Sequence, residues 1–237
     1  MGKTRTPEAP SIILPDYLPH TIIVGSGASI LKHPVAAAID SFPRICRFRG
    51  YDIATNAVKA MYAGRKVTDI GINTSRQVVN LVTKGKDTLV QDADYLITCH
   101  RRDNVRRQQL TDFFKKHTIR FKTVASEDYE KTRNLTSGYL AIMRFLLDYS
   151  VVCIHGFCTV DDTLKKRDKK HYFDRPSDNF KLHDLAYEEK KIRELMAEGK
   201  VVRLTDLINK GMMNEQGTRT SREWFQFARQ AARKFNR

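Results

Sequence analysis

The stretch from Thr21 to Leu31 carries the first residues whose types and spacing suit chemistry. A short apolar run breaks into Gly25, Ser26 and Gly27 and then continues as a helix-compatible segment, which predicts a strand, a tight turn and a helix start. Glycines let the backbone approach a ligand closely, and the N–H groups that begin a helix attract anions such as phosphate. The pattern therefore fits a nucleotide site. It also fits an ordinary tight turn, because it has neither the third glycine of a dinucleotide-binding turn nor the Lys-Ser/Thr of a P-loop.

A second candidate lies in the last third of the chain, where His183 and Glu188 are spaced His-x4-Glu. An imidazole has a pKa near neutrality and can accept a proton from a hydroxyl group, and a carboxylate one helical turn later can fix its tautomer. A lone histidine before a helix is also often a cap or a surface residue. Both interpretations are open on the residues alone.

The composition is that of a folded and strongly basic chain. Its 237 residues are enough for one core, and 41% of them are hydrophobic, without any apolar run that approaches the length of a membrane span. The 42 Lys and Arg residues against 27 Asp and Glu give a net charge of +15, which attracts polyanions, nucleotides and anionic lipid headgroups. With no apolar leader at the N-terminus, we expect a soluble, cytoplasmic protein.

Cysteine usage points to the same compartment. Cys46, Cys99, Cys153 and Cys158 stand in apolar, strand-like runs and show no Cys-x-x-Cys spacing. Buried, reduced thiols are the usual state in such settings. We therefore expect no disulfide and a reducing environment.

Strand and helix patterns alternate along the chain. Strands are predicted at Thr21 to Val24, Arg44 to Phe48, Lys66 to Ile72, Tyr95 to Cys99, Ile119 to Val124 and Val151 to His155. Helices are predicted at Ser29 to Ile39, Thr55 to Tyr62, Arg76 to Thr83, Asp103 to Lys116, Thr136 to Tyr149 and from Ala186 to a stop at Gly199. This alternation predicts an α/β fold, a single Rossmann-like domain with a mostly parallel sheet flanked by helices, whose ligands bind at the carboxyl ends of the strands.

Three segments are predicted to lie outside the repeating pattern. Residues 1–20 contain several prolines and are predicted to be an N-terminal extension of a domain that covers residues 21–237. Residues 161–180 are highly charged and poor in apolar side chains, which predicts a mobile lid loop and is also typical of a disordered, solvated segment. Residues 221–237 predict a basic amphipathic C-terminal helix. This helix either covers the core with its basic face in solvent or meets an anionic membrane surface.

Four short features, in this order, resemble the motifs of the sialyltransferases. The first is Val-Gly-Ser-Gly-Ala-Ser from Val24, followed by an Arg-Phe-Arg at residues 47–49 and Asp-Ile-Gly-Ile-Asn-Thr from Asp69. The second is Leu-Thr-Ser-Gly at residues 135–138 with the His-Gly-Phe at residues 155–157; the third is His-Tyr-Phe from His171, and the fourth is the His-x4-Glu of His183. The resemblance spans residues 21 to 205, and it depends on order and spacing, because none of the motifs is specific alone.

The resemblance implies an inverting displacement in which an acceptor hydroxyl attacks an anomeric carbon while a nucleoside phosphate leaves. It implies that His183 is the base, oriented by Glu188, and that no metal or other cofactor takes part. The implied donor is a nucleotide-linked sugar, most simply a CMP-linked acidic sugar, and the acceptor is a glycan or glycoprotein. The implied contacts to the nucleotide and its phosphate are Gly25, Ser26, Gly27, Arg49, Thr136, Ser137, Gly138, His171 and Tyr172.

The chain also departs from the family's pattern. The first Asn of the family's long motif is Ser26 here, and the Asn of its Arg-x-Asn is Arg49. The Gly-x-Gly-x-Ser that begins at Gly25 is closer to the turn of the bacterial sialyltransferases. Asp92-Ala93-Asp94 spells the metal-binding Asp-x-Asp of other glycosyltransferases, but it precedes a strand, so we interpret it as a turn at the amino end of the sheet.

Two other functions compete with the glycosyltransferase. A nucleic-acid-binding or nucleic-acid-processing protein would use the +15 charge as its phosphate-binding surface, although no recognition motif is present and aromatic residues do not alternate with the basic runs. The third possibility is a sialyltransferase-like fold without catalysis. Charge favours the nucleic-acid function, and the motifs favour the glycosyltransferase.

Overall fold

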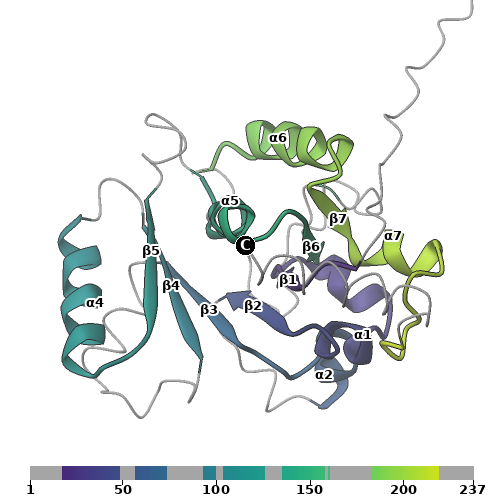
Figure 1. The fold of residues 1–237 in the computed structure, drawn as a ribbon, viewed down its shortest axis with the longest axis horizontal. Helices are drawn as coiled ribbons and strands as arrows, with labels where there is room; N and C mark the ends of the chain where they lie inside the picture. Colours follow the sequence, from purple (N-terminus) through teal and green to yellow (C-terminus); the bar gives the residue numbers. More distant parts are fainter. Residues whose placement is uncertain are drawn as a thin grey trace, which may run out of the picture.

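The computed structural model describes residues 18–48, 57–73, 93–99, 104–125, 135–157, 160 and 183–218. These residues form a seven-stranded sheet with the order β5-β4-β3-β2-β1-β6-β7, and every neighbouring pair is parallel. Helices cover both faces of the sheet (Figure 1). The predicted α/β, Rossmann-like architecture is therefore confirmed.

The strands are β1 Thr21–Val24, β2 Arg44–Phe48, β3 Asp69–Asn73, β4 Asp94–Cys99, β5 Phe121–Ala125, β6 Val152–His155 and β7 Val201–Arg203. The helices are η1 Ala28–Lys32, a 3₁₀ helix, and α1 Ala36–Asp40, α2 Ala57–Ala63, α4 Asn104–Lys116, α5 Ser137–Asp148, α6 Leu185–Ala197 and α7 Leu204–Asn209. None of these helices has the length and apolar character needed to cross a membrane.

Strand β1 lies in the interior of the sheet, at the point where the order of the strands reverses. The chain moves outward from β1 through β2, β3 and β4 to β5, and later returns to β6 on the other side of β1. All four residues of β1 and of β6 are buried, as is usual for parallel strands that are covered on both faces. The carboxyl ends of β1 and β6 therefore form the switch point at which open α/β sheets bind their ligands.

The two faces of the sheet have separate cores. On one face α5 and α6 pack over Ile23, Cys46 and Ile154. The other face is covered by η1, α1, α2 and α7, which pack over the intervening positions of β1, β2 and β6. On this face α4 packs over β3 and β4. Cys46 and Cys153 are free and fully buried, and burial raises the pKa of both thiols, which agrees with the expected reduced state of these two cysteines.

Two parts of the element prediction were wrong. The single helix predicted over Ser29 to Ile39 is two short helices, because the backbone is extended at His33, just before Pro34, and α1 begins only at Ala36. Strand β7 and helix α7 were not predicted, since the strand has only three residues and runs directly into the helix. The helix predicted at Arg76 to Thr83, the lid loop at 161–180, the basic C-terminal helix and all but the last residues of the N-terminal extension lie outside the described residues.

Candidate functional site

The glycine turn after β1 is joined to the end of β6 by backbone hydrogen bonds. The Gly25 N–H donates to the His155 carbonyl at 2.7 Å, and the Gly27 N–H donates to the Gly156 carbonyl at 2.9 Å. A Cβ on Gly25 would lie 2.4 Å from the Gly156 oxygen, so only glycine allows this approach. The turn therefore holds the two strand ends together, and two of the N–H groups expected to bind phosphate already donate within the protein.

The first turn of α5 is the second part of the carboxyl edge. Thr136 is its N-cap, and the Thr136 Oγ1 accepts a hydrogen bond from the Tyr139 N–H at 3.2 Å. Ser137 and Gly138 follow in the first turn, and both are partly exposed. A helix start in which the side chains are this small leaves its N–H groups accessible to an anion.

Glu188 comes from α6 and binds the same helix start. Its Oε2 accepts a hydrogen bond from the Thr136 Oγ1 at 2.6 Å, and its Oε1 accepts one from the Thr136 N–H. The side chain is almost fully buried, with Glu188 only 2% exposed. Two residues that the sequence assigned to different roles, a catalytic carboxylate and a phosphate contact, are thus direct hydrogen-bond partners.

Burial controls the charge of Glu188. Loss of solvation raises its pKa to about 7, and the two hydrogen bonds from Thr136, which favour the carboxylate, only partly oppose that rise. Near neutral pH the group therefore exchanges between its charged and neutral forms. A neutral Glu188 would repel a phosphate at the start of α5 less than a carboxylate would.

His183 lies directly before α6. Asp184 is the N-cap of that helix, and its side chain accepts a hydrogen bond from the Tyr187 N–H at 3.2 Å. His183 is partly buried, and it is not itself the capping residue. The Glu188–Thr136 pair fixes the start of α6 against the start of α5, so His183 is held at the same edge of the sheet as Ser137 and Gly138.

Phe157 connects the parts of this edge. A Cβ on Gly25 would lie 3.1 Å from the Phe157 Cδ2, and a Cβ on Gly138 would lie 2.9 Å from the Phe157 Cε1. The ring therefore lies between the turn after β1 and the first turn of α5. The sequence motifs include the His-Gly-Phe segment but give Phe157 no role. Gly25 and Gly138 were the sequence signal for this contact, because a side chain at either position would meet the Phe157 ring.

A buried histidine on the other face of the sheet was also missed. His155 ends β6, and its Nε2 is buried and makes no hydrogen bond with any described residue. Burial, with smaller effects from His33 and Arg47, lowers the pKa of His155 to about 4, so the ring is neutral at physiological pH. Ser29 on the same edge also buries a hydroxyl that makes no hydrogen bond with any described residue.

Arg49, His171 and Tyr172 lie outside the described residues, so their contacts with a leaving phosphate stay predictions.

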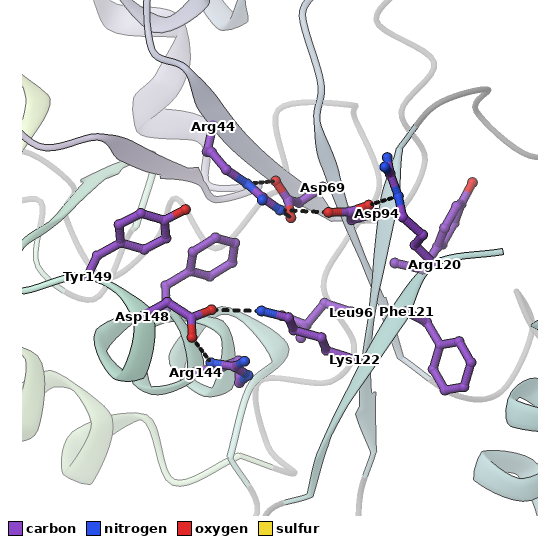
Figure 2. Close-up of a pocket in the computed structure, with 12 residues that line it drawn as sticks. Arg44, Asp69, Asp94, Leu96, Arg120, Phe121, Lys122, Arg144, Asp148 and Tyr149 are labelled. Atoms are coloured by element: carbon purple, nitrogen blue, oxygen red, sulfur yellow. Dashed lines mark hydrogen bonds and ion pairs between the residues drawn. The ribbon is translucent and has the colours of Figure 1, made fainter. Parts of the chain in front are cut away.

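Asp94 begins β4, as expected for a turn at the amino end, and it is ion-paired with Arg44 at 3.0 Å (Figure 2). Among the residues that the structure describes, no three His, Cys, Asp or Glu side chains converge as metal ligands.

The fold is similar to that of a mammalian sialyltransferase solved in complex with Gal-beta-1-3GalNAc-ortho-nitrophenol. The TM-score is 0.52 and the sequence identity 12%, over 78% of this chain and 68% of the sialyltransferase chain. No protein-family model matches this chain, and none of the curated proteins matches it in sequence. The comparison therefore supports a sialyltransferase-like fold.

Proposed function

We propose that this protein is an inverting, metal-independent glycosyltransferase of the sialyltransferase type. It transfers a sugar, in the simplest case an acidic sugar linked to CMP, to a hydroxyl group of a glycan. The observation that carries the proposal is the sialyltransferase-like fold, in which the glycine turn, the Thr136–Gly138 helix start and the His183–Glu188 segment meet at the carboxyl edge of the sheet.

The nucleotide phosphate binds at the start of α5 in this proposal. The N–H of Thr136 already donates to Glu188 and that of Tyr139 to Thr136, which leaves Ser137 and Gly138 as the donors of the first turn. The partial positive charge at the start of a helix stabilises the charge that develops on the departing phosphate. His171 and Tyr172 would add side-chain donors to the same group.

His183 acts as the general base. Its neutral imidazole accepts the proton of the acceptor hydroxyl as that oxygen bonds to the anomeric carbon, while the bond from this carbon to the nucleotide phosphate breaks on the opposite side. Glu188 is a positioning residue, because its carboxyl group is bound to Thr136. It holds the base-bearing start of α6 next to the phosphate-binding start of α5.

A thermal-shift panel tests the nucleotide class and the competing nucleic-acid function together. The ligands are CMP, CDP, UDP, GDP and a short single-stranded DNA, because a ligand that binds only the folded state raises its melting temperature. We expect CMP to raise the melting temperature most. Stabilisation by DNA alone, weakening steeply with added salt, would favour the nucleic-acid function that the +15 charge suggests.

The activity itself is tested by hydrolysis and transfer assays with a CMP-linked acidic sugar. His171→Ala should slow the reaction and weaken nucleotide binding, whereas His183→Ala should slow the reaction and leave binding nearly unchanged. A protein that binds CMP but neither hydrolyses nor transfers the sugar with any glycan acceptor would be a sialyltransferase-like fold without catalysis.

A further inference from the structure

The turn that follows β6 holds Phe157 in place. The Val160 N–H donates a hydrogen bond to the Phe157 carbonyl at 3.1 Å, which closes the turn. The Val160 side chain is 1% exposed and packs in the core that α5 and α6 cover. At the other end of the turn the Phe157 ring lies against Gly25 and Gly138. The position of this ring at the carboxyl edge therefore depends on how firmly Val160 is held.

Arg203 holds this turn from the neighbouring strand. It is the last residue of β7, it pairs with Ile154 of β6, and the chain continues from it directly into α7 (Figure 1). The Arg203 Nη1 donates to the Val160 carbonyl at 3.2 Å. A hydrogen bond from a guanidinium is stronger than one between neutral groups, because its donor is charged. Arg203 thus fixes the end of the turn to the end of β7.

Asp206, in the first turn of α7, sets the direction in which the Arg203 guanidinium points. The Arg203 Nε donates to the Asp206 Oδ2 and the Nη2 donates to the Oδ1, both at 2.8 Å. Two parallel hydrogen bonds of this kind fix the plane of the guanidinium as well as its position. The side chains of Arg203 and Asp206 are 18% and 14% exposed, so water competes little for these bonds. The pairing with Asp206 therefore directs Nη1 toward Val160.

These contacts end at the helix start that the proposed function assigns to the phosphate. Asp206 orients Arg203, and Arg203 holds Val160. The turn at Val160 holds Phe157, whose ring packs against Gly138. The N–H of Gly138 is one of the two donors proposed for the nucleotide phosphate. A displacement of such a donor by about 1 Å is enough to weaken its hydrogen bond strongly.

We propose that Arg203 is a positioning residue, which holds the Phe157 ring in place and, through this ring, the first turn of α5. The proposal rests on the proposed function only for its effect on nucleotide binding, because the contacts from Arg203 to Gly138 need no ligand. None of the sequence motifs includes Arg203 or Asp206. Both act from outside the motifs, through the turn after β6.

Ligand-free ¹H–¹⁵N spectra of the full-length protein test these contacts. Arg203→Met removes the guanidinium and its hydrogen bonds. We expect the amide signals of Gly25 and Gly138 to shift, because both glycines lie next to the Phe157 ring and a moved aromatic ring changes the chemical shifts of nearby protons. Arg203→Lys should shift the same signals, because an ammonium group keeps the charge but cannot form the paired hydrogen bonds.

Lys200→Met is the matched control. Lys200 lies just before the first residue of β7, and its ammonium group pairs with Glu198 at 2.7 Å. Both of these side chains are about half exposed, at 55% and 52%. The variant removes a cation and an ion pair from the opposite end of the same strand, so the signals of Gly25 and Gly138 should stay at their wild-type positions. Melting temperatures of all variants show that each is folded.

A titration with CMP measures what the geometry contributes to binding. CMP should bind Arg203→Met about tenfold more weakly than wild type, because the donors at the start of α5 are displaced. The Lys200→Met protein should bind CMP as wild type does. A purely structural role of Arg203 would lower the melting temperature and leave the CMP affinity of the folded protein unchanged.

A double-variant cycle shows whether Arg203 acts through Phe157. Phe157→Leu removes the aromatic ring and should itself weaken CMP binding. In this background Arg203→Met should cost less than about a further twofold in affinity, because two residues that act on the same group are not additive. Independent contributions would instead multiply.

Several results would overturn the proposal. It fails if Arg203→Met leaves the signals of Gly25 and Gly138 at their wild-type positions, if Lys200→Met moves them as far, or if the losses in the cycle multiply. If Arg203→Met does not fold, Arg203→Lys provides the same comparisons. If wild type does not bind CMP, the proposed nucleotide site is wrong, and the ligand-free spectra still decide whether Arg203 positions Phe157.

Discussion

The two edges of the sheet treat a buried carboxyl group in opposite ways. At the carboxyl edge Glu188 receives its hydrogen bonds from the neutral hydroxyl and amide of Thr136, and burial raises its pKa to about 7. At the amino edge Asp69 is held by the guanidinium of Arg44, and this hydrogen bond raises the pKa of Arg44. Neutral hydrogen-bond donors of Thr136 thus hold the carboxyl group of Glu188, whereas the charged guanidinium of Arg44 holds that of Asp69.

This difference indicates different tasks for the two edges. The ion pair of Asp69 with Arg44 joins the starts of two neighbouring strands and contributes a fixed local structure. A carboxyl group that titrates near neutrality next to a helix start is typical of sites where charge moves. We therefore expect substitutions at the carboxyl edge to change activity and pH dependence, and substitutions at the amino edge to change stability.

The largest expected effect is catalytic. His183→Ala should lower the turnover of a CMP-linked sugar by roughly 10²-fold to 10⁴-fold, because a positioned general base contributes about that much. Nucleotide affinity should change little. The double variant His183→Ala/Glu188→Gln should be hardly slower than His183→Ala, because residues that act as a unit are not additive. Lys190→Ala on the exposed side of α6 is the control, and turnover of His183→Ala at the wild-type rate would refute the assignment.

The next effect concerns stability at the amino edge. Arg44→Met leaves Asp69 buried without its charge partner, which should lower the free energy of unfolding by about 3 kcal/mol. Arg120→Met is the matched control, because the Arg120 side chain is 73% exposed and its ion pair should contribute less than about 1 kcal/mol. Urea denaturation at neutral pH measures both. Equal losses in the two variants would mean that burial of Asp69 does not determine the cost.

The pH dependence of stability distinguishes the edges more finely. The pKa of Glu188 is raised from 4.5 to about 7 in the folded protein, so the folded state binds the proton more tightly than the unfolded state. The resulting stabilisation is complete below pH 4.5 and is lost as pH rises from 4.5 through 7, a loss on the order of 3 kcal/mol.

Glu188→Gln should remove this slope, since glutamine does not titrate. Unfolding free energies of wild type and Glu188→Gln should therefore differ progressively between pH 4.5 and pH 8, with the variant becoming relatively more stable at the higher pH. Glu189→Gln, an exposed neighbour paired with Arg193, should follow the wild-type curve. Parallel curves for wild type and Glu188→Gln would show that Glu188 has an ordinary pKa.

The smallest effect concerns the glycines of the carboxyl edge. Gly25→Ala brings a Cβ to 2.4 Å from the Gly156 carbonyl, and backbone must move to relieve it, so we expect a loss of about 2 kcal/mol. Gly138→Ala brings a Cβ to 2.9 Å from the Phe157 ring, which can shift, so a loss of about 1 kcal/mol is expected. Thermal unfolding of the two variants shows which of them loses more stability. A larger loss for Gly138→Ala would show that Phe157 is the more rigid contact.

Much of the fold could be predicted from the sequence, because alternating apolar runs and helix signals are local features. Strands β1 to β6 and helices α4, α5 and α6 were predicted to within a few residues. The failures were also local: Pro34 splits a predicted helix, and the three residues of β7 are too few to form a recognisable pattern. A strand or helix must be several residues long before its sequence pattern can be recognised.

The contacts that define the two edges could not be predicted in the same way. Thr136 and Glu188 are 52 residues apart, and Arg44 and Asp94 are 50 apart, so only the parallel topology brings these pairs together. The resemblance to the sialyltransferases selected Thr136 and Glu188 but gave them separate roles. Asp69 and Asp94 stand in short motifs, but no motif indicated that either pairs with Arg44, because each ion pair depends on which strand ends become neighbours.

Chemical-shift mapping of CMP binding tests the central claim most directly. In ¹H–¹⁵N spectra of the full-length protein, CMP should shift the amide signals of Ser137 and Gly138 most, together with those of the glycine turn at residues 25–27. The amides of Lys122, Arg144 and Asp148 at the amino edge should not move. Saturable shifts confined to the start of α5 and the glycine turn are the predicted result. No saturable shift, or shifts centred on the amino edge, would contradict a nucleotide site at the carboxyl edge of the sheet.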